Sequence, residues 1–146
     1  EEAGFENVKT IITSGNVAFD ARGRPEANIE ARAEQAMKDL LGRTFFTIVR
    51  SSDSLQALLT SDPYAGHRIA KGAKRIVIFM RTPQAPRIKL PATRQGGTLL
   101  RQIGKNAFAA YTGDDNGPAL MRLIEQAFGQ EITTRTWQTV EKCAVA

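Results

Sequence analysis

Hydrophobic and polar residues recur along this chain with two different periods, and these periods predict its helices and strands. Between Glu26 and Leu41 apolar residues return every three or four positions, which is the spacing of one helix face. Gly42 follows directly and predicts the end of this helix. The apolar stripe is Ile29, Ala33, Ala36, Met37, Leu40 and Leu41, and the opposite face carries Glu26, Glu30, Glu34 and Lys38.

Three further helices are predicted from capping and spacing signals. Ser52 is the predicted N-cap of a brief helix that stops before Asp62-Pro63. Pro118 favours the first position of an amphipathic helix that Gly129 ends. A last helical segment is predicted over residues 137–145.

Segments rich in β-branched and aromatic residues predict the strands. Val8–Phe19 is expected to form one strand with a kink or bulge at Gly15. Lys74–Met80 is apolar at each of its last five positions, which is typical of a strand covered on both faces. Other strands are predicted at Phe45–Val49, Thr98–Ile103, Ala107–Thr112 and Glu131–Arg135, and the middle two should pair as a hairpin across Gly104-Lys105-Asn106.

Helices and strands interleave, but the hairpin interrupts their alternation. This order predicts an α+β fold, with a mixed sheet and helices packed on it, rather than a doubly wound parallel sheet. A length of 146 residues fits a single domain over residues 1–146, with two lobes, 1–72 and 73–146, as an option. Glu1-Glu2-Ala3-Gly4 has the pattern of a helix end, so a strand and part of a helix are expected to precede it.

The composition is that of a globular protein, with 42% apolar and 24% charged residues. No apolar run approaches the ~20 residues that cross a bilayer, so no membrane partner is expected. The single cysteine, Cys143, excludes an internal disulfide framework and favours a cytoplasmic location. Cys143 is expected to be a small buried hydrophobe in the last helix rather than a reactive thiol. The sequence leaves the oligomeric state open.

The net charge of +5 slightly favours anionic partners, either nucleic acid or a phosphorylated small molecule. Segment 81–97 holds three of the six prolines and several cations, so it should run as an extended basic excursion over the surface. A second basic run follows His67. Its residues could meet phosphates, although the scarcity of aromatic residues that would stack on bases favours simple solvated charge. These residues are Arg68, Lys71, Lys74 and Arg75.

No motif specifies a metal or cofactor, and none is expected. His67 is the only histidine, so it cannot build a multi-histidine metal site, and a surface loop is its expected place. Six residues separate Gly97 from Gly104-Lys105, instead of the four of a phosphate loop. Asp114-Asp115-Asn116-Gly117 lacks the alternate spacing of a calcium loop and is predicted to be a turn.

Two motifs carry a family resemblance: Thr10-Ile11-Ile12-Thr13-Ser14-Gly15-Asn16-Val17-Ala18-Phe19 and Thr133-Thr134-Arg135-Thr136-Trp137-Gln138-Thr139-Val140. With them the chain resembles the bacterial domain-of-unknown-function family 1697 (DUF1697), whose members carry Thr-x-Ile-x-Ser-Gly-Asn-Val-x-Phe and Thr-Thr-Arg-Asn-Trp-Asn-Thr-Val. Thr136 and Gln138 replace the two asparagines of the second motif. The resemblance implies a compact α+β fold with two similar ferredoxin-like lobes, and it implies no reaction. The family's opening strand, which ends in Arg-Gly-Ile-Asn-Val-Gly-Gly, has no counterpart here.

The first motif contains one candidate binding site. Ser14, Gly15 and Asn16 could form an anion nest, because glycine lets consecutive backbone N–H groups converge on an oxyanion. The alternative is a β-bulge whose polar side chains satisfy one another.

The second motif contains another candidate. Arg135 could pair with a phosphate or carboxylate while Trp137 stacks on a planar group. Alternatively, Trp137 is a core anchor, and Thr134 or Thr136 caps the final helix.

The leading hypothesis is therefore a binding or regulatory domain for an anionic partner. The alternative is a small enzyme, hydrolytic or phosphoryl-handling, that uses Ser14 and Asn16 with Arg135 as the oxyanion stabiliser. That alternative has no recognisable general base in the sequence.

Overall fold

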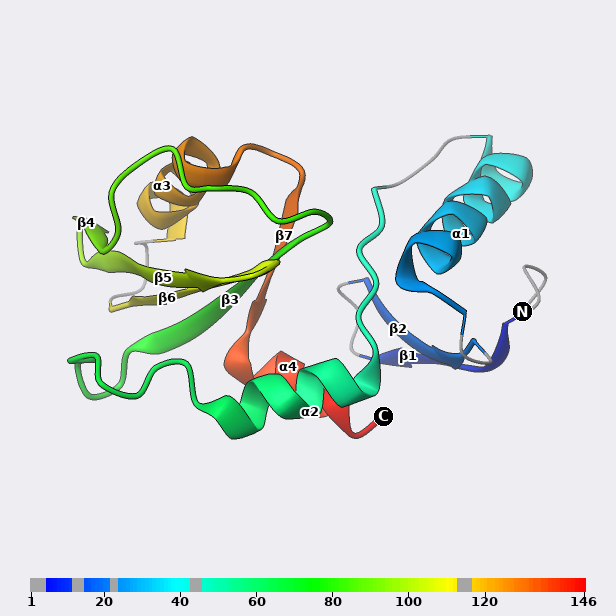
Figure 1. The fold of residues 1–146 in the computed structure, drawn as a ribbon, viewed down its shortest axis with the longest axis horizontal. Helices are drawn as coiled ribbons and strands as arrows, with labels where there is room; N and C mark the ends of the chain where they lie inside the picture. The colour runs from blue at the N-terminus through cyan, green and yellow to red at the C-terminus, as the bar shows by residue number, and fades with distance from the viewer. Residues whose placement is uncertain (1–4, 12–14, 22–23, 43–45, 113–116) are drawn as a thin grey trace.

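The structure is a computed structural model, which describes residues 5–11, 15–21, 24–42, 46–112 and 117–146. These residues form an α+β fold, as predicted (Figure 1). The elements in chain order are β1 (Glu6–Ile11), β2 (Asn16–Asp20), α1 (Glu26–Leu41), α2 (Ser52–Ser61), β3 (Lys74–Met80), β4 (Ala92–Arg94), β5 (Gly97–Ile103), β6 (Asn106–Tyr111), α3 (Gly117–Phe128), β7 (Ile132–Thr136) and α4 (Trp137–Ala144).

A five-stranded sheet in the order β4-β5-β6-β3-β7 organises the second part of the chain. Strand β3 lies inside this sheet, between β6 and β7, and its last five residues are buried. The predicted strand Lys74–Met80 is thus confirmed, as is the hairpin of β5 and β6. Packing on both faces of the sheet explains why the last five residues of β3 are apolar on either side.

The two faces of this sheet carry separate hydrophobic cores. On one face α3 packs on alternate residues of β3, among them Ile76, Ile78 and Met80. On the other face Val77 and Phe79 pack with residues of α2 and α4. Helices therefore cover both faces, and α2 belongs with this sheet although it lies within the expected lobe 1–72. The division into lobes 1–72 and 73–146 stays a prediction.

Every strand pairing among the described residues is antiparallel, which differs from the expected mixed sheet. The interleaved helices suggested parallel pairs, because a helix between two strands usually joins parallel neighbours. Helix α3 does connect β6 to β7, but β3 lies between those two strands and runs antiparallel to both. The succession β3, β5, β6, α3, β7 is that of a ferredoxin-like unit in which residues 81–91 replace the first helix.

The first part of the chain is a hairpin of β1 and β2 beside α1, and we call these three elements the N-terminal unit. The expected single strand Val8–Phe19 is wrong, because the chain reverses between β1 and β2. Gly15 lies in that reversal with φ of +90°, a backbone conformation that glycine adopts at little cost. Phe5 and Phe19 pack at 4.3 Å between ring centroids, and Ile29 of α1 is buried.

Helix α1 has the predicted bounds, and its C-cap is the predicted Gly42. The strand expected at Phe45–Val49 is not found over the described residues 46–49. Side chains satisfy this backbone instead of a neighbouring strand: Thr47 N–H donates to Glu34, and Thr47 C=O accepts from Arg81. We call residues 46–51 the linker, and α2 through α4 the C-terminal unit.

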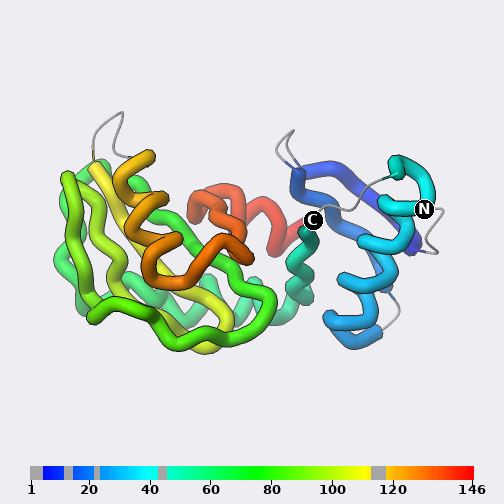
Figure 2. The backbone as a smooth tube through the Cα atoms, turned by 90° about the horizontal axis from the view of Figure 1, so that it is seen from above, coloured from blue at the N-terminus to red at the C-terminus, as the bar shows by residue number. Residues whose placement is uncertain are grey.

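Figures 1 and 2 show the N-terminal unit at one end of an elongated molecule and the five-stranded sheet at the other. Both hydrophobic cores consist of residues between Ile48 and Val140, so the N-terminal unit contributes to neither. Among the helices that the structure describes, none has both the length and the apolar content to cross a membrane.

Candidate functional site

Arg135 is held in one orientation by three oxygen acceptors. It lies on β7, an edge strand of the sheet. Its Nε donates to Asn16 Oδ1 at 2.6 Å, and its Nη1 donates to Thr133 Oγ1 at 2.7 Å and to the Thr134 carbonyl at 2.6 Å. Thr133 can reach the guanidinium because residues two apart on a strand face the same side.

This contact brings together two of the residues that the motifs singled out. Asn16 opens β2 and lies 119 positions before Arg135. Gly15 is also close, since a Cβ placed on it would lie 4.0 Å from Arg135 Nη2. Ser14, the third residue of the predicted nest, lies outside the described residues.

The charge of Arg135 meets no carboxylate within ion-pair distance in the described ranges, since its acceptors are an amide, a hydroxyl and a carbonyl. A guanidinium has five N–H donors, and these three bonds use Nε and Nη1. Both N–H groups of Nη2 therefore stay without a protein acceptor among the residues described. A half-buried cation with only neutral partners is attractive to an anion.

The thiol of Cys143 lies close enough to respond to this charge. Burial raises the pKa of the Cys143 thiol, and the nearby Arg135 opposes that rise only in part. The thiol is thus protonated near neutral pH, which makes it a poor nucleophile.

Trp137 lies in the hydrophobic core and does not extend beside Nη2 of Arg135. Its ring meets Tyr64 edge-on at 5.3 Å, and only 8% of the residue is exposed. Thr136 caps α4, since its hydroxyl accepts from the Thr139 N–H. Trp137 and Thr136 therefore lie where the alternative interpretation placed them, as a core residue and as the cap of the final helix.

The four residues of the predicted basic run are all exposed. Two of them lie over aromatic rings: Lys74 over Tyr111 at 5.6 Å, and Arg75 over Trp137 at 5.3 Å. They lie on or just before β3, at the end of this strand away from Met80. Val77 pairs with Arg135 across β3 and β7, and Arg75 lies two residues before Val77 on the same face, so the run reaches close to Arg135 without contacting it.

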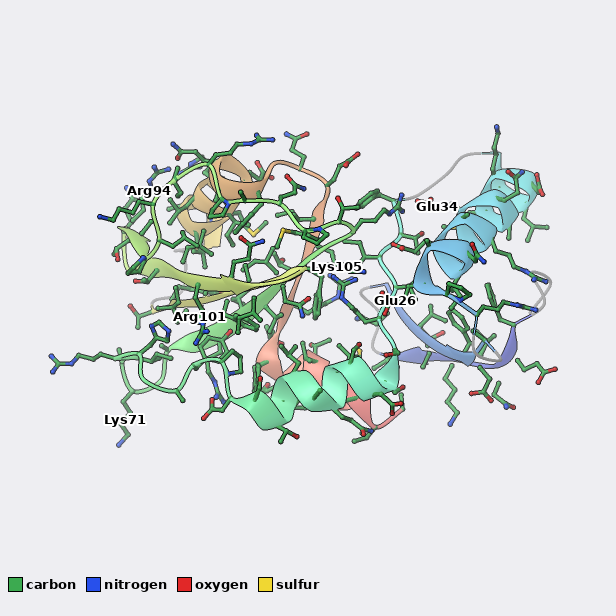
Figure 3. The ribbon with its side chains drawn as sticks, viewed as in Figure 1. Glu26, Glu34, Lys71, Arg94, Arg101 and Lys105 are labelled. Atoms are coloured by element: carbon green, nitrogen blue, oxygen red, sulfur yellow. The ribbon has the colours of Figure 1, made fainter. Side chains whose placement is uncertain are left out.

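Sequence reasoning missed a cluster of ion pairs between the N-terminal unit and the sheet. Arg81 donates to Glu30 at 3.2 Å and to Glu34 at 2.6 Å, and Lys105 pairs with Glu26 at 3.2 Å. We call these contacts the junction; Figure 3 shows Glu26 and Lys105 close together there. The spacing of the three glutamates at every fourth residue predicted a shared helix face, but not its partner.

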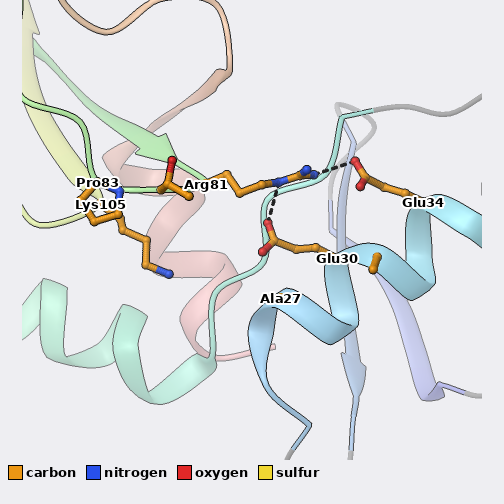
Figure 4. Close-up of a pocket in the computed structure, with 8 residues that line it drawn as sticks. Ala27, Glu30, Glu34, Arg81, Pro83 and Lys105 are labelled. Atoms are coloured by element: carbon orange, nitrogen blue, oxygen red, sulfur yellow. Dashed lines mark hydrogen bonds and ion pairs between the residues drawn. The ribbon is translucent and has the colours of Figure 1, made fainter.

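A cavity of about 360 Å³ lies at the junction (Figure 4). Its walls are α1, the segment after β3 and the β5–β6 turn. Burial would lower the pKa of Arg81, but the Glu34 and Glu30 carboxylates raise it above its usual value. Arg50 of the linker lies nearby and donates to the Met80 and Lys105 carbonyls; burial lowers its pKa. The charges of this cavity are therefore largely compensated by protein groups, unlike that of Arg135.

Residues 1–108 match the family described as "Protein of unknown function (DUF1697)". This match covers more than half of the 146 residues. The chain belongs to the DUF1697 family. This match confirms the family resemblance that the two motifs indicated. The first motif, Thr10 to Phe19, lies within the matched residues of this DUF1697 protein.

The DUF1697 chain is also similar to a solved structure, "conserved bacterial protein SP0830 from Streptococcus pneumoniae". The TM-score is 0.64 at 16% sequence identity, over 99% of this chain and 82% of the other. This likeness supports the fold alone. A comparison with curated proteins gives no match. The family is described as one of unknown function and the neighbour's name states no activity, so the site is interpreted from its own chemistry.

Proposed function

We propose that this protein binds a small anionic ligand, such as a phosphomonoester, between Arg135 and the Gly15–Asn16 backbone. The observation that carries the proposal is the guanidinium of Arg135, which is fixed by three neutral acceptors and has no carboxylate partner within the described residues. Its Nη2 edge keeps two donors, and phosphate oxygens accept from such paired donors at about 2.7–2.9 Å.

Gly15 supports the proposal from the other side. The absence of a side chain there leaves room beside Nη2, and the positive φ turns the backbone as in an anion-binding nest. The ligand would thus contact the N-terminal unit and the C-terminal unit together. Trp137 would contribute indirectly, as the core residue that anchors the strand end carrying Arg135.

An NMR titration tests the proposal. Inorganic phosphate and AMP are added separately to isotope-labelled protein up to about 10 mM, which detects a Kd near 1 mM. We expect saturating shifts of the Gly15 and Asn16 amide signals and of the Arg135 Nε signal. Arg135→Gln should abolish these shifts.

Arg101→Gln is the matched control, because Arg101 is an exposed arginine on β5, which β6 and β3 separate from β7. It should leave the shifts unchanged. Unsaturable or absent shifts in the wild type, or equal shifts in Arg135→Gln, contradict the proposal.

A further inference from the structure

The distribution of charge along the chain divides the sheet into a neutralised end and a basic end. Residues 63–113 contain ten lysines and arginines and no aspartate or glutamate. This stretch forms β3, β4, β5 and β6. Two of the ten cations, Arg81 and Lys105, lie at the junction and pair with glutamates of α1.

At the opposite end of the same strands, the residues that the structure describes form no ion pair of this kind. We call it the basic end; in the described part of the chain none of its cations forms an ion pair. Figure 3 shows Lys71 and Arg94 there, on the side of the molecule away from Glu26 and Glu34. The basic end consists of Arg68, Lys71, Lys74, Arg75 and Arg94.

The sheet register spreads these cations over several strands and over both faces of the sheet. Lys74, Tyr111, Gly97 and Arg94 form one row across four neighbouring strands. Three strand spacings of about 4.8 Å separate the backbone of Lys74 from that of Arg94, or roughly 14 Å. Arg75 points to the opposite face from Lys74, because successive strand residues alternate. Cations spread in this way favour an extended polyanion over a single small anion.

Neutral contacts hold several of these cations in place. Lys74 lies over the Tyr111 ring, Arg75 lies over Trp137, and Arg94 donates to Gln126 at 3.0 Å. Such contacts orient the side chains without cancelling their charge. The arrangement thus differs from that of Arg81, whose contacts include two carboxylates.

The nearby aromatic rings decide which kind of nucleic acid fits. Binding of single strands relies on exposed rings on which bases stack. Here Tyr64 and Trp137 are buried at 4% and 8% exposure with Arg75 over both rings, and Lys74 lies over the half-buried ring of Tyr111. We infer that the basic end binds the phosphate backbone of a nucleic-acid duplex, independently of base sequence and through cations other than Arg135.

Fluorescence anisotropy with a labelled duplex of about 21 base pairs, two helical turns, tests this inference. Contacts to four or five phosphates would lower affinity about 150- to 500-fold between about 50 and 200 mM salt. The triple variant Lys71→Gln, Lys74→Gln, Arg94→Gln should lower the slope of log affinity against log salt by about three. DNA and RNA duplexes are measured separately to distinguish the source of the phosphates.

The control triple variant is Lys9→Gln, Lys38→Gln, Lys142→Gln, which removes the same charge from exposed positions elsewhere. This control should keep the wild-type slope of log affinity against log salt. Arg135→Gln should keep it too, so the duplex inference and the small-ligand proposal can fail independently of each other. Three results overturn the inference: no duplex binding at about 50 mM salt, equal slopes in both triple variants, or tighter binding of the single strand. Displacement of the duplex by polyglutamate at equal charge also overturns it, in favour of an acidic protein.

Discussion

The side chains of Arg135 and Asn16 join β7 to the first residue of β2 through a hydrogen bond of 2.6 Å. This bond links the N-terminal unit to the sheet, and its donor belongs to the guanidinium that we propose as the anion site. The ion pairs of Arg81 and Lys105 link the same two parts. Polar contacts thus both join the units and orient the proposed site.

The strength of the bond between Arg135 and Asn16 can be measured with a double-mutant cycle. Hydrogen bonds to charged groups contribute about 1.5–3 kcal/mol, and partial exposure lowers this value. Asn16→Ala should therefore cost about 1 kcal/mol more in the wild type than in an Arg135→Gln background. Urea unfolding gives both differences. Equal costs in the two backgrounds would show that the bond does not contribute to stability.

Replacement of Arg81 tests whether the junction depends on its ion pairs. Arg81→Met leaves Glu30, which is 6% exposed, without its cationic partner. We expect a loss of about 2 kcal/mol, because an uncompensated buried carboxylate is costly. Amide hydrogen exchange in α1 should increase. The loss should shrink in about 1 M salt, where charges are screened beyond about 3 Å.

The matched control for Arg81 is Arg122→Met. Arg122 is an exposed residue of α3 for which the structure describes no ion pair. It should change stability by less than about 0.5 kcal/mol and leave exchange in α1 unchanged. If both variants behaved alike, the ion pairs would not hold the junction.

Tyr64 gives a pH-dependent prediction. Its hydroxyl donates to the Ile76 carbonyl at 2.7 Å and to the Ala109 carbonyl at 3.2 Å. Burial raises the pKa of this phenol above its usual value. The native state therefore keeps the proton after the unfolded state loses it at about pH 10, so stability is present below that pH and falls as pH rises above it.

Tyr64→Phe should accordingly cost about 1–2 kcal/mol at pH 7, and its stability should fall less than that of the wild type above about pH 10. Urea unfolding at several pH values measures both effects. Tyr111→Phe is the control, because its hydroxyl makes no hydrogen bond to a described residue, and it should cost less than about 0.5 kcal/mol at pH 7. If the stability of wild type and of Tyr64→Phe fell equally with pH above about pH 10, the pH dependence would not come from Tyr64.

Much of the fold could be predicted because local signals agree with tertiary packing. Helix α1 ends where Gly42 predicts, and β3 has the bounds that its apolar run indicates. The hairpin at Gly15 was missed, because a glycine within a β-type run can mark either a bulge or a reversal. Whether the chain bulges or reverses depends on which strand the residues before and after Gly15 pair with. The sequence pattern does not specify that pairing. The strand prediction for Phe45–Val49 was wrong for the same reason, because β-type residues form a strand only where a neighbouring strand pairs with them.

The candidate site was only partly predictable. The motifs singled out Asn16 and Arg135 separately, but no local pattern relates residues 119 positions apart. Their shared site depends on how β2 meets the sheet edge at β7. The junction was missed although its residues were visible, because Glu30 and Arg81 lie on different elements. Charge spacing within a helix defines a face, whereas tertiary structure decides which cation meets it.

Two glycines that lie in hairpin reversals offer a last test of the proposed site. Gly15 has φ of +90° and Gly104 has φ of +60°, so alanine at either position is strained by about 1–2 kcal/mol. Gly15→Ala should also weaken phosphate binding, because it shifts the amides beside Arg135. Gly104→Ala should leave phosphate binding unchanged, since it lies in the β5–β6 turn. Urea unfolding and the NMR titration measure the two effects independently, and equal phosphate affinity in both variants would place the ligand elsewhere than Gly15.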